Sequence, residues 1–298
     1  MKLATYLRNG EPTLGAIVNG RVIALDALDR SLPRTMEALL DGGPPAMDAA
    51  RNAVGKASGG EPLASVQLLA PIRHPRKFLG IGLNYRSHIE ETRKMGLPIP
   101  DVANQIWFNK QTSCITGPND PIHLPSVSEQ FDWEAELGVV IGRRCRHVCA
   151  QDAYKVIAGY MVVNDASVRD WQRRAPTAIL GKGFDTHGPT GPWLTTADEV
   201  ADPHALAIRS LVDGVVMQDG NTDEMVNRID AMIAYVSTVM TLEPGDILAT
   251  GTPNGVAAGR TPSPWLKAGQ VVRIEIEGLG YLENTVIEEP LSETTFIL

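Results

Sequence analysis

Apolar and polar positions near the start of the chain alternate in short runs that end at turn signals. Asn9-Gly10 and Asn19-Gly20 separate these runs, and Asn-Gly between alternating segments is the strongest short-range signal for a β-hairpin. The pattern therefore predicts a meander of three strands. The predicted strands cover residues 3–7, 13–18 and 21–25.

The pattern changes after the meander. Residues 35–40 are predicted to form a short helix, and residues 41–61, which are rich in Gly, Ala and Pro, a weak helix with loops. A more regular succession of apolar runs begins just after Pro71. We therefore expect a small N-terminal domain over residues 1–70 and a larger domain over residues 71–298, a natural division for a chain of 298 residues.

The larger segment contains both strand-like and helical patterns. A helix is predicted over 223–241, where apolar residues recur at helical spacing, and a short one near Ser87, because Ser87 and Glu90 have capping-box spacing. Residues 169–174 are predicted to form one or two helical turns. The predicted strands are 77–83, 105–110, 137–141, 156–163, two runs within 206–218, 247–250, 271–277 and 281–287.

Charge and composition exclude several classes of protein. The formal net charge is −8, from 27 Lys and Arg residues and 35 Asp and Glu residues, without a block of like charge. A nucleic-acid surface needs a basic face, so no nucleic-acid partner is predicted. The N-terminal residues have the pattern of neither a signal peptide nor a membrane span, so a cytoplasmic protein without a membrane partner is expected.

The three cysteines do not form a pattern of known chemistry. They are too few and too odd in number for a disulfide framework. Cys145, His147 and Cys149 are spaced like a fragment of a zinc site, but a closed zinc site requires four ligands and the sequence offers no partner cluster. Zinc is therefore not predicted.

Two glutamates at the start of an apolar run suggest a metal site. In a strand, Glu134 and Glu136 would point to the same side, where their charges repel unless a cation lies between them. Asp165 ends the run 156–163, whose continuous apolar pattern predicts a strand buried on both faces. If these ends meet, three carboxylates converge, and such oxygen ligands suit Mg²⁺ or Mn²⁺. The alternative is a solvated Glu-x-Glu on an edge strand.

His88 and Glu91 are the first candidates for acid–base chemistry. On a helix, residues three apart are neighbours, and a carboxylate beside an imidazole orients it and raises its basicity. That arrangement suits a general base. The alternative is an ordinary pair on a helix surface. The Gly- and Pro-containing connection 95–100 and the segment before it are predicted to act as a lid.

Three further segments carry groups that could bind an anion. Arg169 and Gln172, again three apart, could present a cation and an amide together. Lys182 between two glycines is either a solvated loop charge or a cation held close to a ligand. The tight loop 251–256 could receive an anion on its backbone amides. Neither Gly80-Ile-Gly82 nor the segment around Lys182 completes a nucleotide-binding motif, so a nucleotide-dependent enzyme is disfavoured.

Taken together, these segments resemble the fumarylacetoacetate hydrolase family. They occur in the family's order and span residues 72–286, and their order and number carry the resemblance more than any single motif. Trp133, Trp171 and the connection 95–100 are specific to a subgroup and leave the substrate open. The matching stretches are 82–88 with Glu91, 132–138, 159–165, 169–172, 182–185 and 251–255.

The resemblance implies an α+β fold with a mixed β-roll catalytic domain, a small β-rich N-terminal domain and a homodimer. It implies that Mg²⁺ or Mn²⁺ is the cofactor, that a histidine–glutamate pair activates water and that a lysine faces the reacting oxygen. The implied metal ligands are Glu134, Glu136 and Asp165; the implied catalytic residues are His88, Glu91 and Lys182; the implied substrate-binding residues are Arg86, Arg169, Gln172 and Thr252.

The resemblance also implies a class of reaction. The expected activity is hydrolysis of the C–C bond of a 2,4-dioxo acid of the acylpyruvate or fumarylpyruvate type, as in aromatic catabolism. In that reaction activated water attacks, and a metal-stabilised enolate leaves. The alternatives are decarboxylation of oxaloacetate and isomerisation of a 2-hydroxyhepta-2,4-diene-1,7-dioate type diacid. A catalytically silent, metal-binding structural dimer is a more remote alternative.

Overall fold

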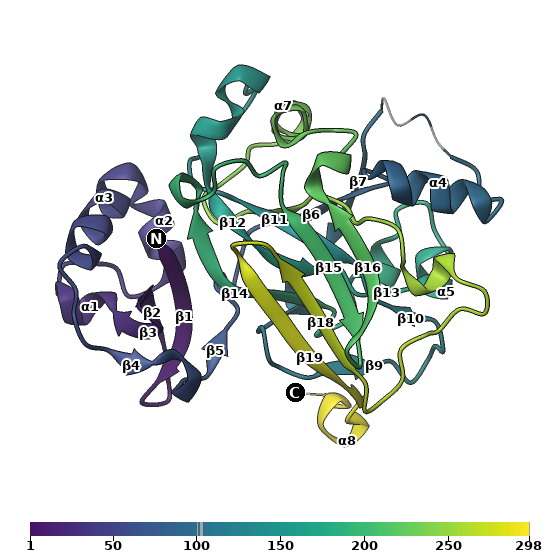
Figure 1. Cartoon of the computed structure of the whole chain (residues 1–298), viewed down its shortest axis with the longest axis horizontal. Coiled ribbons are helices and arrows are strands. Elements are labelled where there is room, and N and C mark those ends of the chain that lie inside the picture. The colour runs from purple at the N-terminus through teal and green to yellow at the C-terminus, as the bar shows by residue number, and fades with distance from the viewer. Residues whose placement is uncertain (100, 102–103, 298) are drawn as a thin grey trace.

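One large mixed sheet runs through the computed structural model, which describes residues 1–99, 101 and 104–297 (Figure 1). Its twelve strands follow the order β4-β3-β2-β1-β14-β12-β11-β17-β6-β7, with β5 paired to β1 and β8 to β14. The strands are β1 (Lys2–Arg8), β2 (Glu11–Val18), β3 (Arg21–Ala24), β4 (Glu61–Pro62), β5 (Leu68–Leu69), β6 (Phe78–Gly82), β7 (Ile106–Lys110), β8 (Ile115–Thr116), β11 (Ala135–Ile141), β12 (Ile157–Asn164), β14 (Gly188–Thr196) and β17 (Ile247–Ala249).

A second sheet of five strands has the order β16-β15-β18-β19-β9. It contains two antiparallel hairpins, one that pairs β15 with β16 across Asp213-Gly214 and one that pairs β18 with β19. A two-stranded ladder, β10 (Phe131–Asp132) with β13 (Ser167–Val168), lies apart from both sheets. The second sheet consists of β9 (Ile122–Leu124), β15 (Ala207–Val212), β16 (Val215–Asn221), β18 (Val271–Ile276) and β19 (Gly280–Glu288).

The central strand β11 is buried on both faces. Leu137 and Val139 pack in the same cluster as Ile208 and Ile274 of the second sheet. Val140, which points the other way, packs in a second cluster with residues of the N-terminal helices. Full burial of such a side chain contributes about 1.5–3 kcal/mol, so the two clusters fix this strand firmly in the sheet.

The helices lie around these sheets (Figure 1). They are α1 (Leu25–Leu28), α2 (Met36–Asp41), α3 (Gly43–Val54), α4 (Arg86–Lys94), α5 (Arg169–Gln172), α6 (Ile179–Lys182), α7 (Ile229–Val239) and α8 (Leu291–Thr294). Short 3₁₀ turns cover Leu63–Ser65, Thr112–Cys114, Ala150–Val156, Ala197–Glu199, Thr222–Glu224 and Ala257–Gly259. The predicted α+β class is confirmed. Among the described residues no helix is long and apolar enough to cross a membrane.

Three predicted helices differ from those observed. The weak helix expected within 41–61 is a regular helix of 12 residues, α3, with proline in its first turn, where a missing N–H costs nothing. Ser87 does not cap α4, because the helix begins one residue earlier, at Arg86. The backbone N–H of Ser87 donates instead to the carboxylate of Glu224. Glu90 forms an ion pair with Arg93 along the same helix.

The helix predicted over 223–241 begins later, because other contacts hold its first residues. The backbone N–H of Val226 donates to the carbonyl oxygen of Asn84, and the N–H of Asn227 donates to the Asn84 side chain. Met225 forms an isolated β-bridge with Tyr85. These long-range bonds replace helical ones, so α7 covers only Ile229–Val239.

The N-terminal strands join the large sheet directly. β1 pairs antiparallel with β14, with Lys2 opposite Thr195 and Leu3 opposite Leu194. The division into domains over residues 1–70 and 71–298 stays a prediction. Pro100, the last residue of the predicted lid connection, lies outside the described residues.

A candidate metal centre with a neighbouring histidine–glutamate pair

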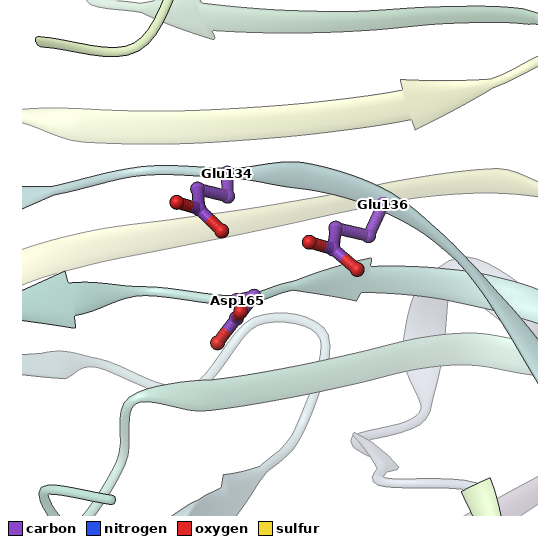
Figure 2. A group of neighbouring side chains, drawn as sticks. All are labelled: Glu134, Glu136 and Asp165. Atoms are coloured by element: carbon purple, nitrogen blue, oxygen red, sulfur yellow. The ribbon is translucent and has the colours of Figure 1, made fainter. Parts of the chain in front are cut away.

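Three buried carboxylates converge at one edge of the large sheet. Glu134 precedes β11, Glu136 lies on it and Asp165 follows β12, and one oxygen from each side chain lies within 4.8 Å of the others. Figure 2 shows the three carboxylates turned toward a common space. The register that opposes Ala135 to Asn164 causes this meeting, because the start of β11 lies beside the end of β12.

The same edge gathers the other segments of the site. β17 runs antiparallel to β11, so its end lies at this edge, and the loop from Gly251 begins there. β6 runs parallel to β17 and ends at the same edge, just before α4. Four adjacent strands therefore deliver the carboxylates, the loop and the helix with His88 to one place.

Two cations that the family resemblance places in the site form ion pairs with these carboxylates. Lys182, at the end of α6, places its Nζ 2.7 Å from Glu134 Oε2 and 2.6 Å from Asp165 Oδ2. It is buried, so it is not a solvated loop charge. Arg169 binds Glu134 Oε1 at 2.6 Å and Asp132 Oδ2 at 2.8 Å.

Lys110 is a third cation, which the sequence analysis missed. Its Nζ lies 2.7 Å from Asp165 Oδ1, and it also donates to the carbonyl oxygen of His187. The side chain is fully buried at the end of β7. A lysine at the end of a predicted strand was the available signal, since a buried lysine requires a partner of opposite charge.

The protonation equilibria of the two glutamates differ sharply. Burial alone would raise the pKa of Glu134, but the charges of Lys182 and Arg169 overcome burial and hold the pKa well below its usual range. Burial raises the pKa of Glu136 well above its usual range, and the charges of Asp165 and Glu134 raise it further. Only Glu134 is therefore stabilised as an anion by its neighbours.

The donor set fits a divalent cation. Four buried carboxylates, those of Asp132 and the three converging residues, face three buried cations, so one negative charge has no ion-pair partner among the described residues. The carboxyl group without an ion-pair partner is that of Glu136, whose raised pKa reflects burial beside two other carboxylates and whose Oε2 accepts a hydrogen bond from the Gly251 backbone N–H. Hard oxygen donors and uncompensated charge are what Mg²⁺ or Mn²⁺ requires.

His88 and Glu91 form a hydrogen-bonded pair on α4. His88 Nδ1 lies 2.8 Å from Glu91 Oε2, and the two side chains are 15% and 12% exposed. They are therefore neither solvated nor sealed from solvent. One loop bonds both Glu136, through the Gly251 N–H, and Glu91, through the Gly255 N–H, which places the pair near the carboxylate cluster.

The predicted anion-binding loop binds carboxylates of the protein itself. The Gly251 N–H donates to Glu136, and the Gly255 N–H donates to Glu91 Oε1 at 2.8 Å. Gly259 lies so close to Glu91 that a Cβ at this position would lie 2.2 Å from its Oε1. The loop thus supports both the carboxylate cluster and the histidine–glutamate pair.

The expected substrate-binding residues divide into two groups. Arg169 donates to Gln172 Oε1 at 2.9 Å, so these two residues contact each other as their spacing predicts, and Arg169 Nη2 has no hydrogen-bond partner among the described residues. Thr252 is buried and accepts a hydrogen bond from Gln218. Arg86 is exposed and donates to the carbonyl oxygen of Asp223, and it forms no hydrogen bond or ion pair with the other expected site residues in the part of the chain that the structure describes.

The cysteine–histidine fragment does not form a metal site in the described part of the chain. Cys149 is exposed and hydrogen-bonds to Asp152, whereas Cys145 is half-buried and pairs through its backbone with Leu242. Within the described residues, the acidic triad is the group whose geometry could hold a metal ion.

Comparisons with known proteins agree with this geometry. The family profile "Fumarylacetoacetate (FAA) hydrolase C-terminal" matches residues 77–287. The human protein "Oxaloacetate tautomerase FAHD2A, mitochondrial" is 44% identical over 270 residues, which are 90% of this chain and 84% of the relative.

Two solved structures extend the comparison. Maleylpyruvate hydrolase from Sphingobium sp. SYK-6, in complex with manganese(II) and pyruvate, is 33% identical with a TM-score of 0.80, covering 97% of this chain and 99% of that one. The 2-hydroxyhepta-2,4-diene-1,7-dioate isomerase from Mycobacterium marinum is 32% identical with a TM-score of 0.74, with the same coverage. The chain therefore belongs to the fumarylacetoacetate hydrolase family of enzymes.

Proposed function

We propose that the enzyme interconverts the keto and enol forms of a short 2-oxo dicarboxylic acid of the oxaloacetate type. The observation that carries the proposal is the 2.8 Å hydrogen bond between His88 and Glu91 beside the carboxylate cluster. The human relative supports the substrate, because its name describes an oxaloacetate tautomerase. Tautomerisation needs one mobile proton and stabilisation of an enolate, and the site offers groups for both.

His88 is the proposed base. Its Nδ1 bonds to Glu91, so the proton on Nδ1 leaves the lone pair of Nε2 free to accept the proton from carbon 3 of the keto acid. The electrons of that C–H bond form the C2–C3 double bond, and the carbonyl pair moves to the oxygen. Return of the proton to this oxygen gives the enol and restores His88.

Lys182 is the proposed cation for the developing enolate. Burial would lower its pKa, but the charges of Asp165 and Glu134 raise it above its usual value. The ammonium is therefore favoured as a hydrogen-bond donor, and Lys182 is not the proposed base. A fixed cation stabilises charge where it develops without solvent reorganisation.

Mg²⁺ or Mn²⁺ is the proposed cofactor, with Glu134, Glu136 and Asp165 as its ligands. When bound, the ion supplies a Lewis acid for the carbonyl oxygen of the oxo acid. The unpaired Nη2 of Arg169 is the proposed donor to a substrate carboxylate, with Gln172 holding the guanidinium in place. Arg86 and Thr252 remain proposed substrate contacts.

Hydrolysis of the C–C bond of a 2,4-dioxo acid is a second candidate. The partial exposure of His88 and Glu91 favours it, because water can reach the pair, and the relative named maleylpyruvate hydrolase supports it. His88 would take a proton from water, and the hydroxide would attack the distal carbonyl carbon. The C–C bond would break with its electron pair on carbon 3, which gives pyruvate enolate and a free acid.

The two candidates are separated by products. The purified enzyme with Mg²⁺ or Mn²⁺ is incubated with oxaloacetate, acylpyruvates and fumarylpyruvate, the enol is followed by its ultraviolet absorbance, and products are identified by mass. Faster keto–enol exchange of oxaloacetate without loss of mass supports tautomerisation. Pyruvate with a free acid establishes hydrolysis, and pyruvate with carbon dioxide establishes decarboxylation; either result without enhanced exchange overturns the first proposal.

Two expectations from the sequence remain part of the proposal. The three cysteines are free, which is compatible with the reducing cytoplasm expected for this chain. A homodimer is also proposed, and size-exclusion chromatography with light scattering tests it.

A further inference from the structure

Asp132 is a buried carboxylate that the proposed chemistry does not use. Its two oxygens accept four hydrogen bonds: Oδ1 accepts from the backbone N–H groups of Trp133 and Ala257, and Oδ2 accepts from the N–H of Ala258 and from Arg169 Nε. A carboxylate has about four acceptor positions, so this side chain is fully satisfied. It belongs to β10, which pairs with β13 and not with either larger sheet.

These bonds connect Asp132 both to the carboxylate cluster and to the His88–Glu91 pair. On one side, Arg169 continues to Glu134 Oε1, over 2.6 Å, and so fixes a proposed metal ligand. On the other side, Ala257 and Ala258 lie in the loop whose Gly255 N–H holds Glu91 Oε1. Glu91 in turn holds His88.

We propose that Asp132 is a positioning residue that fixes the His88–Glu91 pair relative to the carboxylate cluster. It acts through Arg169 toward the cluster and through the loop at Ala257 toward the pair. The proposal rests on the proposed function for its catalytic readout, but its structural readouts do not depend on the substrate. The relative position of the pair and the cluster matters, because catalytic groups lose efficiency when displaced by about 1 Å.

Two substitutions separate the two connections. Asp132→Asn retains the size of the side chain but places an NH₂ group against N–H donors at one of its two positions, so both connections weaken. Ala257→Pro removes a single N–H and leaves Arg169 bound to Asp132. The backbone before this position suits proline, because Val256 has φ −64° and ψ 157°, the extended conformation that a residue before proline adopts. Ser263→Ala, which removes a hydroxyl bonded to Arg260 in the same loop, is the matched control.

Hydrogen exchange of the metal-free protein measures the connection from Asp132 through the loop to α4. Both Asp132→Asn and Ala257→Pro are expected to speed exchange in α4, and Ser263→Ala is expected to leave it unchanged. Titration calorimetry with Mn²⁺ measures the connection from Asp132 through Arg169 to the carboxylate cluster. Asp132→Asn is expected to raise the Kd for Mn²⁺ by about tenfold, as other losses of outer-sphere support do, while Ala257→Pro leaves it unchanged.

Kinetics on oxaloacetate complete the test. Ala257→Pro is expected to lower kcat by about tenfold at nearly constant KM, since it disturbs the proton-transferring pair, and to cause no further loss in a Glu91→Gln background. Unchanged α4 exchange in both variants, or kcat losses that multiply in the Glu91→Gln background, would overturn the proposal. If the wild-type protein does not process oxaloacetate, the proposed function fails, while exchange and Mn²⁺ affinity still decide the role of Asp132.

Discussion

Lys110 and Asp165 form an ion pair of 2.7 Å in which neither side chain is exposed. The second oxygen of Asp165 binds Lys182, so the carboxylate is held at both ends. Burial of a charge is costly, and a fold tolerates a buried lysine or aspartate when the opposite charge is buried beside it.

Replacement of Lys110 by methionine should destabilise the protein by about 3–5 kcal/mol, because Asp165 Oδ1 loses its cation and Asp165 is left with Lys182, which it shares with Glu134. Urea unfolding of the metal-free protein measures the change. The double variant Lys110→Met/Asp165→Asn should recover part of the loss, since neither charge remains. Equal stabilities of wild type and Lys110→Met would contradict the structural importance of the pair.

Replacement of Glu134 and of Glu136 by neutral glutamine should change the stability of the metal-free protein in opposite directions. The pKa of Glu136 is raised, so this carboxylate is stabilising below its unfolded pKa and loses that contribution as the pH rises. Glu136→Gln should therefore stabilise the metal-free protein at pH 7 by about 1 kcal/mol or more. The pKa of Glu134 is lowered, so Glu134→Gln should destabilise the protein at pH 7 and matter less as the pH falls through the acid range.

Both glutamine variants should bind Mn²⁺ more weakly, because each lacks one charged ligand. Calorimetric titration and unfolding of the same samples therefore separate metal affinity from stability. Stability changes of the same sign in the two variants would show that the charges of Lys182 and Arg169 do not distinguish the two carboxylates. Unaltered Mn²⁺ affinity would refute the ligand assignment.

Replacement of His88 by alanine should lower kcat by about 10²–10⁴-fold, the usual contribution of a general base. The Kd for Mn²⁺ should change little, since His88 is not among the three proposed ligands. His74→Ala is the matched control, because His74 is exposed. Activity that survives in His88→Ala would assign the base to another residue.

His187 should make the fold sensitive to acid. Burial lowers its pKa to about 3, so the native protein keeps the ring neutral while the unfolded chain binds a proton below about pH 6.5. Stability is thus lost as the pH falls from 6.5 toward 3, by about 2 kcal/mol at pH 5. The loss between pH 7 and pH 5 should be smaller by this amount in His187→Gln, and parallel pH profiles of the two proteins would refute the prediction.

The convergence of the three acidic residues could be predicted because it depends on local rules. Alternation along a strand places Glu134 and Glu136 on one side, and the position of Asp165 at the end of an apolar run places it at a strand end. The spacing of His88 and Glu91 predicts their contact in the same way, because both residues lie on one helix. Their catalytic and ligand roles stay predictions.

The partners of these residues depend on contacts between distant segments, which no local pattern encodes. Lys110 is separated from Asp165 by 55 positions, and Asp132 is separated from Ala257 by 125. The late start of α7 has the same cause, since Asn84 binds residues that helical periodicity alone would include in the helix. Sequence patterns identify which groups need a partner, but the fold decides which partner they meet.

The carboxylates, α4 and the loop from Gly251 all lie at one edge of the sheet, which has a consequence for how such enzymes diversify. The register between β11 and β12 fixes the carboxylates, whereas α4 and the loop from Gly251 follow strand ends and are free of that register. Side-chain exchanges in those two connections that keep the backbone bonds of Gly251 and Gly255 can therefore reshape the substrate space while the three carboxylates stay where they are. A scaffold of this kind allows a lineage to acquire new substrates by changing its connections, with its carboxylate cluster inherited intact.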